Sequence, residues 1–336
     1  MDAASLPKSV TLHDVAREAG VSLMTVSRAL SNPGVVSEKT LARVQEAVVK
    51  TGYVPNLLAG GLKSKRSQLV AALVPAISVA QFLPTVQALT DTLDAAGYQV
   101  MLGQTRYDHA RETPLLNAML GRRPDGIVVT GLLRSDEARE QLRRLAIPVV
   151  ETWDLSERPV DMVVGFSHLK VGSAIAGYFL RNGWNRLGIA TGDDHRASMR
   201  REGFLSVVGR EVPTAFVPAP SSLELGRQAL SDLLQQDPKL EAVYCSSDQL
   251  AQGAITEAQA RGLRVPEDLA VCGFGDAGFA AHMKPSLTTI SVNGAAIGRM
   301  AAQLIIDRCR GQKVEEPVID IGFQLIERES TRKAAP

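Results

Sequence analysis

The stretch Thr11–Leu30 contains two short amphipathic helices around a glycine turn. Apolar residues at helical spacing give each helix one buried stripe, and Gly20 and Val21 form the turn between them. Ser22 stands where the second helix needs an N-cap. The two stripes are Val15, Ala16 and Ala19, then Val26, Ala29 and Leu30. This pattern predicts a helix-turn-helix, in which the capped end of the second helix points into a groove of DNA.

The face opposite the second stripe carries Thr25, Ser27 and Arg28, which suits contact with phosphates and bases. A plain helical hairpin with a solvated face is the alternative. A third helix is predicted between Ser37, its N-cap, and Gly52, where it ends. Its inner stripe is Leu41, Val44, Ala47 and Val48. Three such helices make a small DNA-binding unit.

From Leu69 onward, short apolar runs alternate with helical stretches. Near-continuous apolar strands joined by helices are typical of parallel sheets that are covered on both faces. The predicted strands are 69–74, 98–103, 125–131, 148–153, 162–166, 186–191, 214–217, 242–247 and 269–274. Nine strands are many for one compact sheet, so we expect an α/β core of two doubly wound lobes. A ligand cleft should lie where the carboxyl ends of the strands meet.

Composition and charge indicate more than one domain and a different function for the N-terminal segment than for the rest of the chain. A length of 336 residues is too long for one ordinary core, and 45% hydrophobic with 22% charged residues is typical of globular domains. Residues 1–66 hold nine Lys and Arg against five Asp and Glu, a charge of +4, whereas the rest hold 28 against 31, a charge of −3. The positive charge is therefore concentrated in the helical segment, as a phosphate-facing surface requires.

Three cysteines, Cys245, Cys272 and Cys309, lie far apart in apolar runs. We interpret them as buried thiols in a reducing compartment, not as a disulfide or zinc set. The first nine residues have no apolar core for a signal peptide, and no apolar run approaches the length of a membrane span. We therefore expect a cytoplasmic protein that needs no metal and no cofactor.

One motif could suggest an enzyme. Gly273–Gly278 matches GxGxxG, the dinucleotide fingerprint, after a predicted strand. Pro285 stops the following helix early, however, and the position where an acid should bind the ribose is Gly298. No nucleophile, acid pair or metal-ligand cluster stands out, and the five histidines are scattered. The sequence does not favour an enzyme.

Several stretches match, in order and spacing, those of one family of bacterial proteins. They are VTLHDVAREAGVSLMTVSRALSNPGVVSEKT (10–40), GYVPN (52–56), SDQLAQGAI (247–255), GLRVPEDLAVCGF (262–274) and PSLTTI (285–290). The chain thus resembles the LacI family of transcription repressors over Val10–Arg328. Four stretches are similar to the gluconate-operon repressors of that family: IPVVETWD (147–154), VGF (164–166), GFGD (273–276) and DIGF (320–323).

The resemblance implies a helix-turn-helix domain over 1–55, a hinge over 56–67 and a two-lobed core over 68–336. The core would resemble periplasmic sugar-binding proteins, bind the effector and form the dimer. Its N-lobe would cover about 68–163 and 292–323, and its C-lobe about 164–291 and 324–332. A homodimer, or a dimer of dimers, would bind a pseudo-palindromic operator. A small sugar acid such as gluconate, bound between the lobes, would release the protein from the operator.

For DNA, the resemblance implies base contacts from Leu23, Met24, Ser27 and Arg28, and phosphate contacts from Thr11, Thr25 and Asn56. Arg28 can bind guanine through two hydrogen bonds, while Leu23 and Met24 offer only apolar contact. Polar residues are more usual at those two positions, so sequence preference should rest on Arg28 and on DNA shape.

The segment Asn56–Lys63 matches the family's hinge helix, which folds on the operator and inserts a leucine into the minor groove. Leu62 occupies that leucine's position. Gly60 and Gly61 precede it, and each costs a helix about 1 kcal/mol relative to alanine. Folding of the hinge should therefore depend strongly on DNA.

For the effector, the resemblance implies a cleft lined by Gln81, Phe82, Thr130, Glu151, Arg200, Ser247 and Asp276. Arg200 is the sharpest candidate, because a planar guanidinium holds a carboxylate with paired hydrogen bonds. Its alternative is a solvated arginine in the basic run 196–201. Phe82 could be a core ring, and Glu151 a buried, paired carboxylate. Asp276 lies one residue beyond the family's aspartate, whose place Gly275 takes.

Other functions remain open at this point. A regulator of the same family could answer to a neutral sugar or need a co-repressor. A sugar-binding transport protein would share the core but should lack residues 1–66 and carry a signal peptide. A nicotinamide enzyme would require the GxGxxG motif to bind a dinucleotide.

Overall fold

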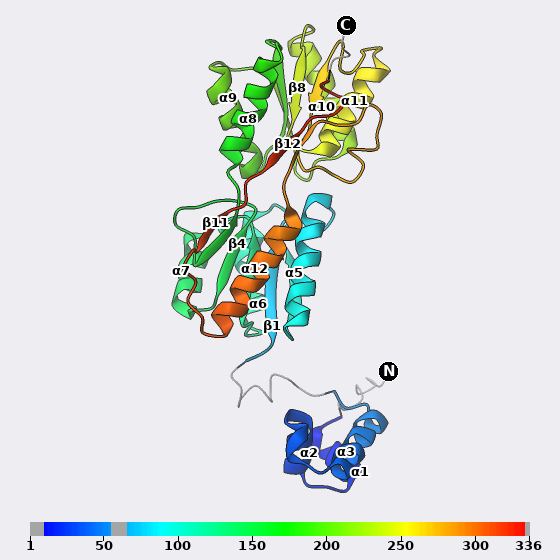
Figure 1. Cartoon of the computed structure of the whole chain (residues 1–336), viewed down its shortest axis with the longest axis vertical. Coiled ribbons are helices and arrows are strands. Elements are labelled where there is room, and N and C mark those ends of the chain that lie inside the picture. Colours follow the sequence, from blue (N-terminus) through cyan, green and yellow to red (C-terminus); the bar gives the residue numbers. More distant parts are fainter. Residues whose placement is uncertain (1–9, 55–65, 333–336) are drawn as a thin grey trace, which may run out of the picture. The chain divides into compact units, whose positions relative to one another are not determined.

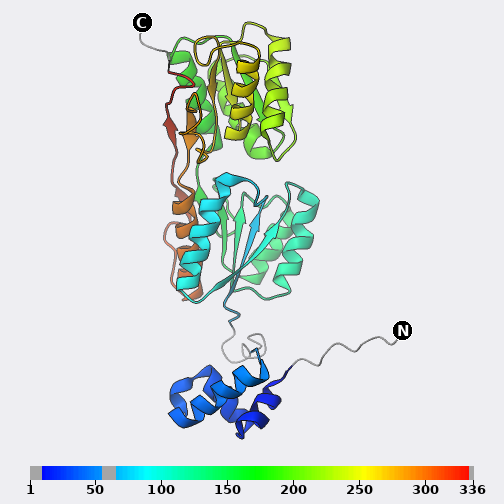
Figure 2. The ribbon, with the colours of Figure 1, turned by 90° about the vertical axis from the view of Figure 1, so that its right-hand side faces the viewer.

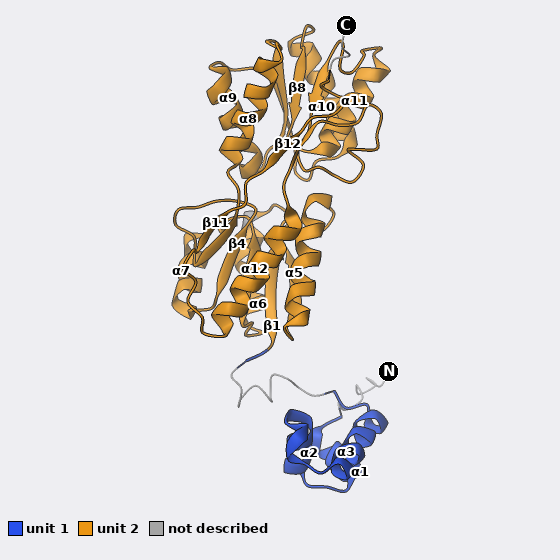
Figure 3. Ribbon diagram, in the orientation of Figure 1, with its two compact units in different colours: residues 1–67 blue, residues 68–336 orange. Residues whose placement is uncertain are grey.

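The computed structural model describes residues 10–54 and 66–332, and the chain divides into two compact units, residues 1–67 and 68–336 (Figure 3). Asn56, Gly60, Gly61 and Leu62, which the sequence places in the hinge, lie outside the described residues. Within the described ranges, no helix is long and apolar enough to cross a bilayer.

Residues 10–54 form a bundle of three helices around a small apolar core (Figure 1). Thr11 donates its N–H and its hydroxyl to the Asp14 carboxylate at the start of the first helix, which ends at Gly20 with a φ of 60°. Ser22 and Ser37 cap the other two helices by accepting a backbone N–H three residues ahead. The elements are α1 (Leu12–Ala19), α2 (Leu23–Ser31), the 3-10 turn η1 (Pro33–Val35) and α3 (Glu38–Thr51). The core consists of Val15, Ala16, Ala19, Val26, Ala29, Val44 and Ala47.

Residues 66–332 contain two parallel sheets, each with helices on both faces (Figure 2). We call the part built on the six-stranded sheet the N-lobe and the part built on the four-stranded sheet the C-lobe. The six-stranded sheet has the order β11-β5-β4-β3-β1-β2. Its strands are β1 (Leu69–Val74), β2 (Gln99–Gln104), β3 (Gly126–Thr130), β4 (Val149–Thr152), β5 (Met162–Gly165) and β11 (Val318–Asp320).

Alternate residues of the N-lobe strands enter two different cores, which explains why these strands are apolar on both faces. Val70 and Ala72 share a core with α5 and α12, whereas Ala71 and Leu73 share one with α6 and α7. The N-lobe helices are η2 (Ala80–Phe82), α5 (Leu83–Ala95), η3 (His109–Arg111), α6 (Glu112–Leu120), α7 (Asp136–Leu145) and α12 (Gly294–Cys309).

The C-lobe repeats this arrangement on a sheet of order β7-β6-β8-β9. A Cβ atom on Gly172 would lie 1.8 Å from the carbonyl oxygen of Arg200, so the α8–α9 contact requires glycine there. The strands are β6 (Leu187–Gly192), β7 (Thr214–Val217), β8 (Ala242–Cys245) and β9 (Ala270–Cys272). The helices are α8 (His168–Arg181) and α9 (His195–Val208) on one face, α10 (Leu223–Gln236) and α11 (Asp248–Ala260) on the other.

The α/β fold class and all nine predicted strands, β1–β9, are confirmed. Within 66–332 the chain crosses between the lobes three times: after β5, after β10 (Thr289–Ser291), and between β11 and β12 (Gln324–Ile326). β10 and β12 form an antiparallel pair that the sequence analysis missed. The first crossing follows Gly165, slightly after the expected boundary at about 163.

Candidate functional site

A cleft lies at the carboxyl ends of strands from both lobes. Its larger cavity, of about 560 Å³, is lined by residues that follow β1, β2, β3, β4 and β6. A smaller cavity of about 40 Å³ is lined by residues that follow β6, β7, β8 and β9 of the C-lobe and β1, β2, β4 and β5 of the N-lobe. Tyr107, Asp194 and Arg196 line both cavities, so the two adjoin. Because open α/β sheets bind ligands at this edge, the cleft is the candidate ligand site.

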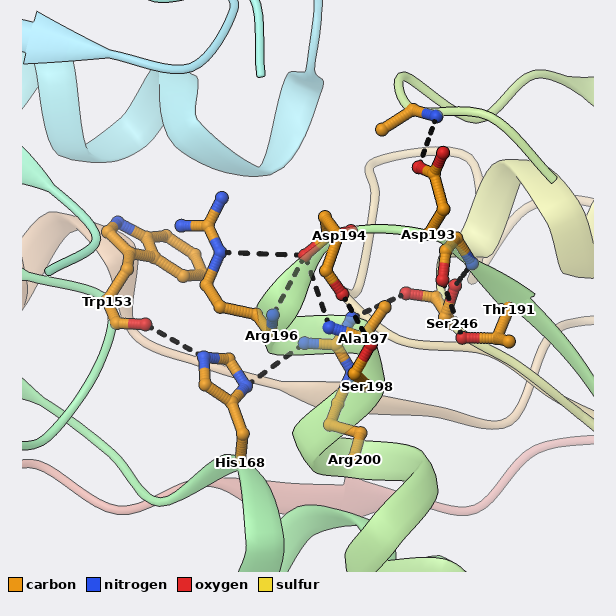
Figure 4. A network of polar contacts seen from close by, with 12 residues as sticks. Trp153, His168, Thr191, Asp193, Asp194, Arg196, Ala197, Ser198, Arg200 and Ser246 are labelled. Atoms are coloured by element: carbon orange, nitrogen blue, oxygen red, sulfur yellow. Dashed lines mark hydrogen bonds and ion pairs between the residues drawn. The ribbon is translucent and has the colours of Figure 1, made fainter. Parts of the chain in front are cut away.

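Arg200, on α9, is a buried cation in the wall of the smaller cavity, with 5% of its surface exposed. Its guanidinium carbon lies 4.1 Å from the centroid of the Phe274 ring. Its N–H groups donate to the Tyr244 hydroxyl at 2.9 Å. They also donate to Nδ1 of His168 at 3.0 Å and to the Ser246 carbonyl at 3.2 Å (Figure 4). All three acceptors are neutral, and no carboxylate of the described residues lies within 4.0 Å of this guanidinium. The alternative of a solvated arginine is therefore wrong.

The tautomer of His168 follows from its partners. Nε2 lies 2.9 Å from the Trp153 carbonyl oxygen, which can only accept, so Nε2 carries the proton. Nδ1 is then the acceptor for Arg200. Burial, together with the charges of Arg200 and Arg196, holds the pKa of His168 well below its usual range. The ring is neutral and fixes one orientation of the arginine.

Arg196, one helical turn before Arg200, brings a second guanidinium to the cleft (Figure 4). Its Cζ lies 5.2 Å from the centroid of the Phe82 ring. Its Nε is 4.0 Å from a carboxylate oxygen of Asp194, which already caps α9 by accepting two backbone N–H groups. Its Nη1 is buried without a hydrogen-bond partner in the described part of the chain. Two arginines on successive turns therefore make this wall suitable for an anion.

The structure brings four of the seven expected effector residues to the cleft. Thr130 lines the larger cavity, while Gln81, Arg200 and Ser247 line the smaller one. Ser247 also caps α11 and lies 2.7 Å from the hydroxyl of Ser221. These residues lie at or after the ends of different strands and join in one site only through the fold.

Contrary to expectation, Glu151 lines neither cavity because its side chain is fully buried. One oxygen accepts from the Leu133 N–H and pairs with Arg139 at 3.0 Å, while the other accepts from the Val160 N–H. Burial raises the pKa of Glu151, although these hydrogen bonds and the charge of Arg139 act to lower it. Glu151 therefore positions Arg139, which does line the larger cavity.

Phe82 and Asp276 also lie elsewhere than expected. Phe82 is buried beneath Arg196 and meets the Trp153 ring edge-on, with 5.1 Å between the ring centroids. Asp276 pairs with Arg328 at 2.8 Å and lines a separate groove. Phe82 is thus a supporting core ring, and Asp276 has no contact with the arginine wall.

Sequence reasoning missed several residues of the site, among them Tyr107, Trp153, His168, Asp194 and Arg196. Each follows the end of a strand within a few positions, so the strand-end rule could have found them. Tyr107 and Trp153 also have φ values of 59° and 63°, which are uncommon for bulky residues and mark sharp turns into the cleft.

In the first unit, the expected base-reading residues are exposed on α2. Leu23 and Met24 expose 38% and 64% of their surface, and Ser27 and Arg28 are also exposed. Thr25 is partly buried, its hydroxyl 2.8 Å from that of Ser22. Exposed apolar side chains at the N-terminus of α2, on the same helix as an exposed arginine in its last turn, suit a surface that another molecule covers.

Comparison with known proteins assigns both units. The family model of bacterial regulatory proteins of the lacI family matches residues 11–56, and that of the periplasmic binding protein-like domain matches residues 176–331. The HTH-type transcriptional regulator GntR of Pseudomonas aeruginosa is 37% identical over 330 residues, covering 96% of this chain and 95% of the relative. The HTH-type transcriptional repressor CytR of Escherichia coli K12 is 30% identical over 339 residues, covering 99% of each chain. A solved LacI-family regulator from Silicibacter pomeroyi has a TM-score of 0.91 at 34% identity, covering 96% of this chain and 100% of that one.

Proposed function

Since the chain belongs to the LacI family of DNA-binding transcriptional regulators, we propose that it represses an operon for the use of a sugar acid. A small carbohydrate with a carboxylate, gluconate in the first instance, binds between the two lobes and releases the protein from its operator. The protein is not an enzyme, in keeping with its relatives.

The observation that carries this proposal is the buried guanidinium of Arg200. A buried charge without a counter-charge costs several kcal/mol, and neutral hydrogen-bond acceptors offset only part of that cost. A carboxylate that binds Arg200 supplies the missing charge, whereas a neutral sugar does not. Three of the five guanidinium N–H groups have acceptors among the described residues, which leaves two for a ligand.

The rest of the cleft suits a polyol chain. The carboxylates of Asp154 and Asp194 and the hydroxyls of Tyr107 and Ser247 line the two cavities and can bond to sugar hydroxyls. Gluconate carries one carboxylate and several hydroxyls on a single chain. This combination supports a sugar acid over a plain anion.

On the DNA side, we propose that a homodimer places one α2 helix in the major groove of each half-site. Arg28 would bind guanine, Leu23 and Met24 would contact thymine methyl groups, and Thr11 and Thr25 would bind phosphates. Ser27 would add a further base contact. A regulator that binds chromosomal DNA acts in the bacterial cytoplasm.

Two measurements test the effector. The free energy of unfolding is compared with and without gluconate, gluconamide, in which a neutral amide replaces the carboxylate, and glucose. Gluconate at a hundred times its dissociation constant should add roughly 2.7 kcal/mol. The same compounds are then titrated against the protein bound to an operator selected from random duplexes. If glucose or gluconamide stabilises the protein and releases DNA as well as gluconate does, the effector is a neutral sugar and the proposal fails.

A further inference from the structure

Two pairs of buried hydrogen bonds, joined by the residue Trp153 itself, lead from Arg200 in the C-lobe to the start of α12 in the N-lobe. Arg200 donates to Nδ1 of His168 at 3.0 Å, and Nε2 of His168 donates to the Trp153 carbonyl at 2.9 Å (Figure 4). The indole Nε1 of Trp153 donates to the Thr85 hydroxyl at 2.9 Å. That hydroxyl donates to the Gly294 carbonyl, also at 2.9 Å. We call these five residues the Arg200–Gly294 chain.

Every donor in this chain points the same way. The Gly294 carbonyl can only accept, so Thr85 donates to it and must accept from the indole. The Trp153 carbonyl fixes the His168 proton on Nε2 in the same manner. All five residues are buried, so water does not replace any of these bonds. The two bonds on each side of Trp153 are linked through one group, His168 or Thr85, so the bonds of each pair strengthen one another in a low-dielectric interior.

The packing around the chain leaves little room for independent movement. A Cβ atom on Gly294 would lie 2.9 Å from the Thr85 hydroxyl oxygen and 3.2 Å from a ring carbon of Trp153, so this contact needs glycine. Phe82 and Phe166 meet the Trp153 ring edge-on at 5.1 and 6.0 Å. Trp153 also has a left-handed backbone, a conformation that persists only where its surroundings hold it.

The far end of the chain lies where the protein passes from one lobe to the other. Gly294 is the first residue of α12, and α12 follows β10 directly after the second crossing. Thr85 meets α12 again one turn later, because a Cβ atom on Gly298 would lie 2.3 Å from the Thr85 carbonyl oxygen. A shift of Thr85 therefore moves α5 and α12 together.

We propose that His168, Trp153 and Thr85 are positioning residues that couple occupancy of Arg200 to the placement of α5 and α12. This inference rests on the proposed function, since it takes a carboxylate on Arg200 as the signal. A ligand that draws the guanidinium toward itself changes the contact at Nη1, which His168 shares. The His168 ring cannot move with the guanidinium unless Trp153, to which it is hydrogen-bonded, moves too. The Trp153 indole in turn cannot move unless Thr85 moves with it. The ligand thus favours one position of α5 and α12 over another.

Thr85→Val in the full-length protein is the sharpest test, because it replaces the hydroxyl with a methyl group and Thr85 lines neither cavity. The probe is gluconate. Its dissociation constant is measured by calorimetry, and the concentration that half-releases operator DNA by fluorescence anisotropy. We expect the dissociation constant to change less than threefold and the half-release concentration to rise at least tenfold. Thr85→Ser, which keeps the hydroxyl, should restore release.

Thr92→Val is the matched control. Thr92 lies on the same helix, and among the described residues its hydroxyl bonds only to the Ala88 carbonyl of that helix. Both measured values should stay within threefold of the unmodified protein. If Thr85→Val releases operator at the unmodified protein's gluconate concentration, or if Thr92→Val impairs release equally, the inference is overturned.

A spectroscopic readout separates this inference from the proposed function. The chain has two tryptophans, so Trp184→Phe leaves Trp153 as the only indole emitter. Gluconate should shift its emission, and Thr85→Val in that background should remove most of the shift. If gluconate does not bind at all, the proposed function fails. Arg200→Gln should then still change Trp153 emission without any ligand, and unchanged emission would overturn the coupling itself.

Discussion

Replacing Arg200 by glutamine isolates the charge that we assign to effector recognition. Glutamine keeps a polar group but lacks the positive charge and the paired N–H donors of the guanidinium. Opposite charges about 4 Å apart at an effective dielectric of about 20 attract by about 4 kcal/mol, and a hydrogen bond to a charged group contributes about 1.5–3 kcal/mol. Part of this is lost to desolvation of the ligand carboxylate. We expect a net loss of about 2–4 kcal/mol, or roughly 30- to 1000-fold in the dissociation constant of gluconate.

The assay is a thermodynamic cycle of four dissociation constants, measured by calorimetry. The unmodified protein and Arg200→Gln are each titrated with gluconate and with neutral gluconamide. Gluconate should lose most of its affinity, while the affinity of gluconamide should change only a few-fold. Urea unfolding of both proteins controls for damage, because the variant leaves Tyr244 and Ser246 without their donor. Equal losses for the two ligands would show that Arg200 supports the wall and does not recognise charge, which would refute the reasoning.

Three further predictions concern the scaffold and the DNA-binding unit. Gly172→Ala should lower the free energy of unfolding in urea by about 3 kcal/mol, because its Cβ would clash with the Arg200 carbonyl. The control is Gly177→Ala, whose Cβ would meet only the end of the Arg181 side chain at 3.1 Å and which should be neutral or stabilising. Burial raises the pKa of Asp248 from 3.8 to about 6, so the folded state holds this proton more tightly than the unfolded state does. The free energy of unfolding should therefore fall by about 3 kcal/mol as pH rises from 4 to above 6. Urea unfolding at a series of pH values tests this, and the same fall in Asp248→Asn would contradict it. Arg28→Ala should weaken the preference for operator over random DNA by about 1–3 kcal/mol in competition binding, with gluconate-induced stabilisation unchanged; an unchanged preference would remove Arg28 from the reading face.

The sequence predicts the larger elements of this fold because their signals are local. β1–β9 are apolar runs bounded by polar turns, and α1–α3 have cap residues and stripes in phase. β10, β11 and β12 have only three residues each, and exposed or half-buried positions interrupt the apolar pattern of β11 and β12. Their pairing joins segments distant in the chain, such as Thr289 with Ile326. No local pattern carries that information.

The site was only partly predictable, for a reason that Glu151 illustrates. Residues two apart in a strand point to the same face, so regular alternation would place Glu151 and Trp153 alike. Glu151 lies buried beside Arg139, while Trp153, two positions on, turns into the smaller cavity through its left-handed backbone. Sequence reasoning locates the end of β4 but not this turn. The partners of Arg200 likewise come from α8, β8 and the segment after it, which only the fold brings together.

The groups that accept hydrogen bonds from Arg200 are all neutral. Burial raises the pKa of Tyr244 to about 12, so its hydroxyl stays neutral at physiological pH. His168 is a neutral acceptor, and the Ser246 carbonyl cannot ionise. Among the described residues, then, no group in contact with this guanidinium can become an anion. Asp154 interacts with Arg200 electrostatically without touching it, so in the proposed function a bound carboxylate is the first anion in contact with the guanidinium. For that reason the difference in affinity between gluconate and gluconamide is more informative than the affinity of either.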